Sequence, residues 1–286
     1  MTTKAKEIKS FLIKFLRNTV GAVTYEKIRA RQYLGYWPNI HEPKTLNEKI
    51  IQAKLFRIPS SAVMLSDKVA VRDFVKGIIG ENYLNKLYFS GDSLTGVDFS
   101  ALPEKFIIKA NNGCEGNIII REKSKANIQD IDHSINHFLS KSFGYLTNEI
   151  WYLDIKPQIL IEELMEDEKG NIPDDYKFFC FNGVCKMIQV NKDRFSNHNI
   201  LFYDEEWNKF PFGLSHYPYA ADLSKPENFD EMKNIAEKLS KNIEFVRVDL
   251  YSYNKTIKFG EMTFAPNAGW KPFTPNKYDL ILGSLW

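Results

Sequence analysis

The sequence lacks several patterns that would assign a function directly. Its three cysteines, Cys114, Cys180 and Cys185, match neither a metal site nor a redox CxxC pair. It has no serine nucleophile elbow, and the pair His133 and His137 lacks the glutamate of a metalloprotease motif, so hydrolase chemistry has no support. No apolar run approaches about 18 residues and no secretory h-region is recognisable, so we expect a protein of the reducing cytoplasm.

An excess of charge of one sign is also missing. The formal net charge of +2 is too small to indicate nucleic acid as a partner. Aromatic residues make up 14% of the chain, which excludes a disordered protein, and 286 residues allow one or two domains with a large core. The composition is therefore typical of a globular enzyme or binding protein.

Acidic residues do occur in two apolar runs near the end of the chain, where a carboxylate costs stability. Strand alternation places Arg247 and Asp249 on one face of the run 245–251, and Glu261 and Thr263 on one face of the run 257–264. A three-residue hairpin loop would put Asp249 opposite Glu261, whereas a two-residue loop would put them on opposite faces. Facing carboxylates repel unless a cation lies between them, so the pair predicts a Mg²⁺ site. Arg247 adds a guanidinium whose N–H groups match the oxygens of a phosphate. A hairpin with its acids in water is the alternative.

A lysine at the end of another apolar run predicts an anion. Lys109 ends the run that starts at Phe106, where a lysine needs an anion or a route to water. The segment 111–116 follows with two asparagines and two glycines, which tolerate the backbone conformations that turn N–H groups toward phosphate oxygens. No Gly-Lys-Ser/Thr ends this loop, so it is not a Walker A loop, and an ordinary turn with an edge lysine is the alternative.

Elsewhere the pattern predicts an α+β organisation. Residues up to about 100 are expected to be mostly helical, with a helix near 47–57 and another starting at Ser66. Strands are expected at 105–121 and 158–164, with a helix near 127–142 between them. A strand from Asp175, a hairpin at Asn182-Gly183, a return strand at 184–190 and a helix near 228–242 complete the prediction.

The order of these pieces resembles the ATP-grasp superfamily, and most closely its teichuronopeptide-synthesis-type branch. The resemblance covers most of the chain, including residues 43–50, 66–72, the Lys109 loop and the strands at 175–177 and 261–263. It implies an ATP-grasp fold in which two α+β subdomains clasp ATP. The implied division is a mostly helical N-terminal region at 1–100, a lid with the phosphate loop at 101–164, and a core with the metal site at 165–286.

The resemblance also implies roles for individual residues. Lys109 corresponds to the lysine on the α and β phosphates, residues 162–164 to the hinge whose backbone reads adenine, and Asp175 to the ribose contact. Arg247 corresponds to the arginine beside the transferred phosphate and, with Lys109, is the candidate catalytic residue. The candidate ATP-binding residues are Lys109, Asn111, Gly113, Gly116, Glu162, Glu163, Leu164, Asp175, Lys177 and Arg194, and the candidate Mg²⁺ ligands are Asp249, Glu261 and Thr263. Lys68, Arg72, Lys177 and Arg194 are also candidates for holding a substrate anion.

Two positions depart from the pattern of the superfamily. Thr263 takes the place of an asparagine that often follows the metal glutamate, and a hydroxyl is a weaker Mg²⁺ ligand. Glu115 adds a negative charge to the phosphate loop. Both departures favour one alternative, a nucleotide-binding module without catalysis.

Charge layout and resemblance together predict an ATP-dependent carboxylate–amine ligase that acts through an acyl phosphate. The expected substrates are a uronic acid or amino acid and an amine, in the synthesis of bacterial surface polysaccharide such as capsule. A glycosyltransferase is the rival, with Asp174 and Asp175 as its acidic motif, although it would not need the Lys109 loop. Segment 6–17 interleaves basic and apolar residues, which predicts a helix that docks on the protein's own core or lies on the inner membrane surface beside lipid-linked sugars.

Overall fold

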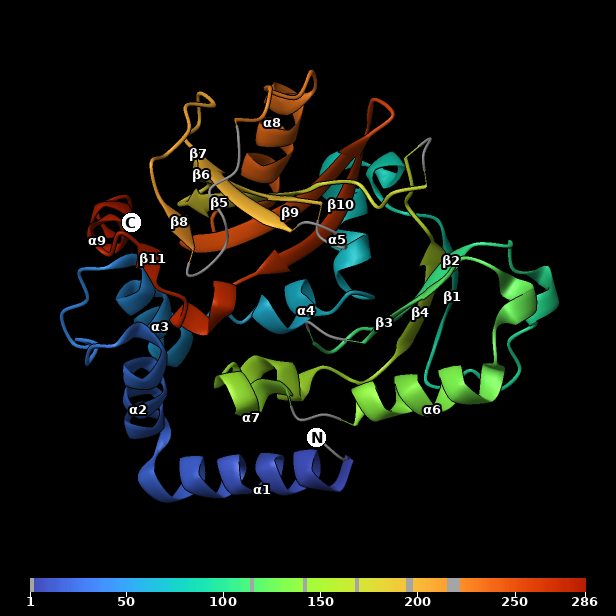
Figure 1. The fold of residues 1–286 in the computed structure, drawn as a ribbon, viewed down its shortest axis with the longest axis horizontal. Coiled ribbons are helices and arrows are strands. Elements are labelled where there is room, and N and C mark those ends of the chain that lie inside the picture. The colour runs from blue at the N-terminus through green and yellow to red at the C-terminus, as the bar shows by residue number, and fades with distance from the viewer. Residues whose placement is uncertain (1–2, 114–115, 141–142, 168–169, 194–197, 215–221) are drawn as a thin grey trace.

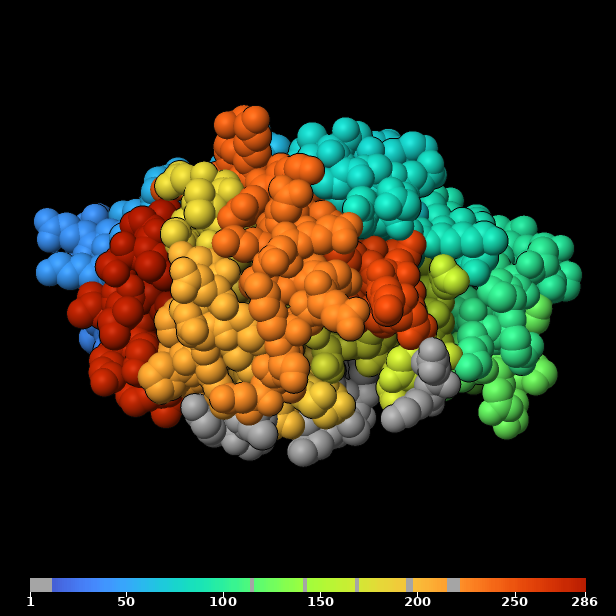
Figure 2. Space-filling view, turned by 90° about the horizontal axis from the view of Figure 1, so that it is seen from above, coloured from blue at the N-terminus to red at the C-terminus, as the bar shows by residue number. Residues whose placement is uncertain are grey.

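The chain folds into a helical N-terminal region and two antiparallel sheets (Figure 1). The structure is a computed structural model and describes residues 3–113, 116–140, 143–167, 170–193, 198–214 and 222–286, with side chains from residue 12 onward. The helices within residues 22–56 and the helix at 277–283 lie at one end of the molecule (Figure 1), and the residues around 100–140 form the other end (Figures 1 and 2).

Helices and strands follow one another in a mixed α+β order. The helices are α1 Thr3–Val20, α2 Ala22–Leu34, α3 Leu46–Phe56, α4 Ala62–Ser66, α5 Val71–Ile79, α6 Ile128–Leu139, α7 Phe143–Thr147, α8 Phe229–Leu239 and α9 Lys277–Gly283, with short 3₁₀ turns η1 Glu81–Tyr83, η2 Phe99–Ala101, η3 Lys123–Lys125, η4 Ile150–Asp154 and η5 Pro266–Gly269. The strands are β1 Leu87–Gly91, β2 Phe106–Ala110, β3 Asn117–Ile120, β4 Ile159–Glu163, β5 Asp175–Phe181, β6 Val184–Lys192, β7 Asn199–Tyr203, β8 Gly213–Leu214, β9 Phe245–Tyr253, β10 Thr256–Thr263 and β11 Phe273–Thr274.

Most helices expected from the sequence are confirmed, and one is placed wrongly. Thr45 and Glu48 form a capping box that starts α3, close to the expected position, and α6 and α8 match the expectations near 127–142 and 228–242. The helix expected to start at Ser66 is wrong, because Ser66 ends α4 and α5 begins at Val71. The Asp67 side chain accepts the backbone N–H of Val69 at 2.8 Å, a local bond that interrupts the helix there.

A four-stranded sheet in the order β1-β4-β2-β3 carries the Lys109 segment. Helix α6 packs on one face of this sheet (Figure 1), where its Ile131 and Ile135 join Phe106, Ile108 and Ile161 in one buried cluster. The alternation in β2 buries Phe106 and Ile108 against that helix. Lys109 lies on the other face of the strand and lines a pocket.

The second sheet has the order β10-β9-β5-β6-β7 and holds the larger core. Helix α8 covers β5, β6 and β9, with Phe229 packing on Phe178 at a ring-centroid distance of 6.2 Å. The hairpin predicted at Asn182-Gly183 is confirmed, and Cys180 and Cys185 face each other across it as buried free thiols. This sheet is rigidly supported on its helix-covered face, which fixes the strands that carry the acidic residues.

The β9–β10 hairpin settles how Asp249 and Glu261 face each other. Its loop is the two-residue one, Asn254-Lys255, and both residues have positive φ, as a tight hairpin turn requires. That loop alone would place the two acids on opposite faces. A β-bulge at Gly260 inserts one extra residue into β10, so that Glu261 pairs with Asp249. A Cβ at Gly260 would lie 3.0 Å from the backbone oxygen of Asp249, so a larger residue would crowd the bulge.

Helix α1 docks on the protein's own surface. Arg17 Nε donates to Asn148 Oδ1 at 2.6 Å, and Lys14 Nζ lies 4.9 Å from the ring centroid of Tyr145. The docking alternative is therefore confirmed for the described side chains, while Leu12 and Phe15 remain exposed. Within the described residues, no helix combines the length and the apolar character needed to span a membrane.

Candidate active site

One pocket of about 710 Å³ brings most of the predicted site residues together. Its volume lies in the range of small-molecule sites. Both sheets contribute to it, together with α2 and the segment after β10. Its lining includes Lys109, Glu162, Glu163, Leu164, Asp175, Lys177, Arg247, Asp249, Glu261 and Thr263. Residues separated by more than 150 positions in the sequence therefore face one cavity.

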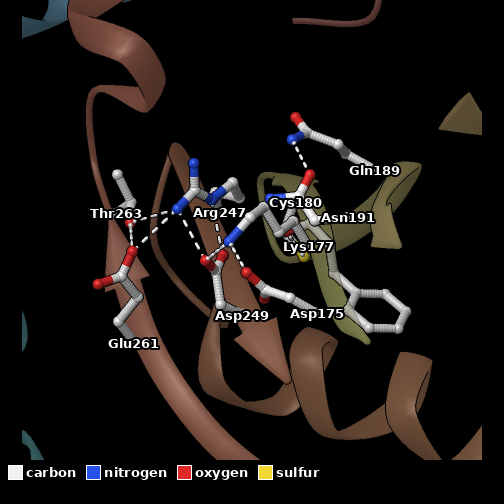
Figure 3. A network of polar contacts seen from close by, with 10 residues as sticks. Asp175, Lys177, Cys180, Gln189, Asn191, Arg247, Asp249, Glu261 and Thr263 are labelled. Carbon is white, nitrogen blue, oxygen red and sulfur yellow. Dashed lines mark hydrogen bonds and ion pairs between the residues drawn. The ribbon is translucent and has the colours of Figure 1, made fainter. Parts of the chain in front are cut away.

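The guanidinium of Arg247 lies between the two acids of the β9–β10 hairpin (Figure 3). Its Nε and Nη2 donate to Oδ1 and Oδ2 of Asp249 at 2.6 and 2.7 Å, a bidentate contact. Nη2 also reaches Glu261 Oε1 at 3.0 Å and Thr263 Oγ1 at 3.1 Å. In this structure, the cation between the facing carboxylates of Asp249 and Glu261 is therefore Arg247, which lies in the same strand as Asp249.

Lys177 extends the network to the neighbouring strand. The pairing of β5 with β9 puts Lys177 opposite Asp249, and its Nζ forms ion pairs with that carboxylate and, at 2.6 Å, with Asp175 Oδ2. These side chains are buried except for Glu261, whose side chain is 36% exposed. Three carboxylates and the two cations Arg247 and Lys177 make up this cluster, and the charge of Lys68 also acts on Glu261.

The charges in the network also set its proton equilibria. Burial alone would raise the pKa of Glu261, but the charges of Arg247, Lys68 and Lys177 lower it to about 2. Burial raises the pKa of Asp249, and the attraction of Arg247 and Lys177 opposes this shift. Glu261 is therefore ionised at neutral pH and turns an anionic oxygen toward the pocket.

The donor set in this cluster fits Mg²⁺ that binds together with a nucleotide. Asp249, Glu261 and Thr263 carry two carboxylates and a hydroxyl, which are hard oxygen ligands, and Arg247 holds both oxygens of Asp249 in this structure. Within the part of the chain that the structure describes, no group of three or more acidic, histidine or cysteine side chains is arranged to hold a metal ion. Mg²⁺ commonly takes one or two protein carboxylates and completes its shell with phosphate and water oxygens, which is the share available here.

The anion that Lys109 binds in the structure is a carboxylate of the protein itself, Glu162. Lys109 Nζ lies 2.7 Å from Glu162 Oε2, and Arg72 Nη1 lies 2.6 Å from the other oxygen of the same carboxylate. Arg72 also donates to the backbone oxygen of Asn85 at 2.7 Å, which fixes it. If Lys109 turned to a phosphate, Glu162 would keep Arg72 as its partner, so the exchange would not leave a bare buried carboxylate.

The predicted phosphate-loop residues are engaged with the protein. Asn111 donates to Asp67 Oδ1 and to the backbone oxygen of Lys156, both at 2.9 Å, and accepts the N–H of Gln158 at 2.7 Å. Gly116 has a φ of +90°, and a Cβ there would lie 2.9 Å from Phe138. Asn111, Gly113 and Gly116 are not among the described residues that line the pocket. Arg194, Glu115 and Cys114 lie outside the described residues.

The acids Asp174 and Asp175 do not act as a pair. Asp175 lines the pocket, whereas Asp174 accepts the backbone N–H of Asp193 at 3.1 Å at the end of the β5–β6 hairpin. Asp174 precedes β5 and Asp175 is its first residue, and the two carboxylates have different partners. The arrangement gives no support to the acidic motif of a glycosyltransferase.

Two residues that line the pocket, Glu149 and Trp270, and two buried residues in contact with Trp270, Glu26 and Lys54, were not found from the sequence. Glu149 is buried, and burial raises its pKa to about 7 although Lys54 opposes the shift. Trp270 donates from Nε1 to Glu26 at 2.5 Å, and Glu26 forms an ion pair with Lys54 at 2.9 Å, with both charged side chains fully buried. These four residues lie far apart in the sequence, and no periodic signal links them.

The fold is that of an ATP-grasp protein. The chain belongs to the TupA-like ATP-grasp family, whose model matches residues 48–286. No curated protein matches the chain.

Solved structures similar to this chain include ligases of low sequence identity. The D-alanine–D-alanine ligase of Bacillus anthracis in complex with ATP has 12% identity and a TM-score of 0.43, with 71% of this chain and 54% of that chain covered. The L-amino acid ligase of Bacillus licheniformis has 10% identity and a TM-score of 0.46, with 81% and 50% covered. This chain thus spans about half the length of these two proteins.

Removing Arg247 tests whether the acid network depends on it. In Arg247→Met, the buried Asp249 would keep only Lys177, which it shares with Asp175, so we expect a loss of roughly 3–5 kcal/mol in the free energy of unfolding, typical of a buried ion pair that loses one partner. Lys156→Met is the matched control, because Lys156 pairs with Asp92 on the exposed surface. Urea unfolding curves measure both. An equally small change in the two variants would contradict the account.

The buried Glu149 predicts a pH dependence of stability. Its pKa is about 7 in the folded protein against 4.5 for the ordinary group, so the folded state holds the proton more tightly. The stability that this proton confers is complete below about pH 4.5 and is lost as pH rises through about 7, by up to about 3 kcal/mol. Glu149→Gln should remove this dependence, so its free energy of unfolding should rise relative to that of wild type as pH rises. Unfolding curves between about pH 4 and pH 8 measure it, and parallel profiles would refute the assignment.

Proposed function

We propose that the protein is an ATP-dependent carboxylate–amine ligase that forms an amide through an acyl phosphate. The observation that carries the proposal is the contact of Arg247 with Asp249 and Glu261 in the same pocket as Lys109. Phosphoryl transfer requires positioning and charge stabilisation rather than a protein nucleophile. A pocket that places Arg247, Lys177 and Lys109 beside carboxylates suits that chemistry.

In the first step, a carboxylate oxygen of the substrate attacks the γ-phosphorus of ATP. The bond from the γ-phosphorus to the bridging oxygen breaks, and ADP leaves with its electron pair. Arg247 would stabilise charge on the transferring phosphoryl group, because its guanidinium lines the pocket and stays charged. Lys109 would exchange Glu162 for the α and β phosphates of ATP.

In the second step, an amine attacks the carbonyl carbon of the acyl phosphate. The C–N bond forms, the C–O bond to phosphate breaks, and inorganic phosphate leaves while the amine nitrogen gives up a proton. The two sheets that line the pocket would limit the access of water to the acyl phosphate. Asp249, Glu261 and Thr263 would hold Mg²⁺, which when bound supplies charge neutralisation between the phosphates.

The backbone of residues 162–164 and the carboxylate of Asp175 would contact adenine and ribose, as the resemblance to the superfamily implies. The carboxylate substrate would be a uronic acid or an amino acid, free or linked to a nucleotide, lipid or polymer. We place the reaction in bacterial surface polysaccharide synthesis, on the cytoplasmic side and with α1 at the inner membrane surface. Helix α1 would stay docked on the protein through Lys14 and Arg17, and its exposed Leu12 and Phe15 would be the side chains that meet the membrane.

Trapping the acyl phosphate tests the reaction. With ATP, Mg²⁺, hydroxylamine and a carboxylate such as D-glucuronate or L-glutamate, the protein should form a hydroxamate and ADP, because hydroxylamine takes the place of the amine. Lys109→Met should lower the rate by about 10²-fold or more, as for other preorganised charges. Lys105→Met is the control, because this neighbouring lysine pairs with Glu166 on the surface.

Two products would contradict the proposal. Formation of AMP and pyrophosphate would mean that the α-phosphorus is attacked instead. Transfer of a sugar without consumption of ATP would restore the glycosyltransferase reading. Binding of ATP with no turnover of any carboxylate would favour a nucleotide-binding module.

A further inference from the structure

The pocket has a second charged corner that the nucleotide chemistry does not use. Arg29 and Tyr33 of α2 line it, together with Trp270 and Lys271 after η5. Helix α2 precedes residue 48, where the match to the family begins, so Arg29 and Tyr33 come from outside the matched segment. Residues that confer substrate preference on this chain are expected in such a segment.

The Trp270 side chain forms one wall of this corner, and its contacts fix its position. Its indole N–H is held by Glu26, and Lys54 Nζ lies 4.4 Å from its ring centroid. The backbone leading to it has positive φ at Asn267, Ala268 and Gly269, and a Cβ at Gly269 would lie 3.0 Å from the backbone oxygen of Asn47. The indole is therefore held from behind by a buried ion pair and by a tightly packed turn.

Arg29 is attached to that wall by aromatic contacts. The Tyr33 and Trp270 rings are stacked, with centroids 5.6 Å apart and planes at 3°. The guanidinium carbon of Arg29 lies 5.0 Å from the Tyr33 centroid and 5.1 Å from that of Trp270. The stack orients the guanidinium without neutralising it.

The hydrogen bonds of Arg29 leave its charge uncompensated. Nη1 donates to Gln32 Oε1 and Nη2 to the Tyr33 hydroxyl, each at 3.1 Å, and both acceptors are neutral. Its Nε is buried, and no described residue accepts a hydrogen bond from it. Among the described side chains, no carboxylate forms an ion pair with Arg29. A buried N–H of a cation without an acceptor costs stability unless an anion meets it.

We propose that Arg29 and the Tyr33–Trp270 stack form the subsite that binds a carboxylate of the substrate. The guanidinium fork matches the two oxygens of a carboxylate, and Lys271 adds a second cation to the same lining. The inference rests on the proposed function and gives its carboxylate substrate a binding site in this chain. A sugar acid and an amino acid both carry the required group, and binding measurements separate them.

Calorimetric titration of the full chain with D-glucuronate, L-glutamate and neutral D-glucose, in the presence of Mg²⁺ and ADP, tests this subsite. At least one carboxylate should bind and glucose should not. Arg29→Gln should weaken that binding by roughly 10–100-fold, the value of hydrogen bonds to a charged group. Arg31→Gln is the matched control, because Arg31 lies exposed on the same helix and outside the pocket lining. ADP binding should be unchanged in both variants.

A second measurement on wild-type protein does not depend on whether a variant folds. Phenylglyoxal modifies accessible guanidinium groups, and the bound carboxylate should slow modification of Arg29 several-fold while leaving Arg31 unaffected. Mass spectrometry of the digested protein reports both sites.

The results separate this inference from the proposed function. Binding of ADP without binding of either carboxylate, equal affinity of Arg29→Gln and wild type, or protection of Arg29 by glucose would overturn the subsite alone. Failure to bind either ADP or ATP would instead overturn the proposed function.

Discussion

The contact of Arg247 with Asp249 and Glu261 is the interaction on which the site depends. Three buried or half-buried carboxylates in adjacent strands would repel one another without Arg247 and Lys177. Those contacts in turn require one register, which the bulge at Gly260 creates after a two-residue loop. A single glycine in a strand therefore decides whether Glu261 faces the pocket or the opposite side of the sheet.

The same cations that stabilise the acids are those that phosphates would attract. Arg247 and Lys109 each hold a carboxylate in the structure, and each of those carboxylates keeps a second cation, Lys177 for Asp249 and Arg72 for Glu162. An incoming anion can therefore share a cation without leaving a buried acid unpaired. Mg²⁺ brought in with the nucleotide would offset the charge of its phosphates beside these carboxylates, so the protein and its proposed ligand would have complementary charges.

Much of the fold and part of the site could be predicted from local sequence patterns. Strand alternation gave the shared face of Arg247 and Asp249, and the Asn182-Gly183 turn fixed the β5–β6 hairpin. The partner of Lys109 could not be predicted, because Glu162 reaches it through pairing of β2 with β4 across 53 positions. The corner around Trp270 joins residues 26, 29, 33 and 54 to the end of the chain through tertiary packing alone, and local patterns carry no information on such contacts.

The claim that the acids of the β9–β10 hairpin hold Mg²⁺ together with ATP is tested most directly by thermal unfolding. Wild-type protein and Glu261→Gln would be heated with ATP, with Mg²⁺, and with both, and UDP-glucuronate would replace ATP in a parallel series. The account predicts that Mg²⁺ increases the stabilisation by ATP in wild type, and that Glu261→Gln keeps the effect of ATP alone but loses this increment. An equal increment in both proteins, or stabilisation by UDP-glucuronate and not by ATP, would contradict it.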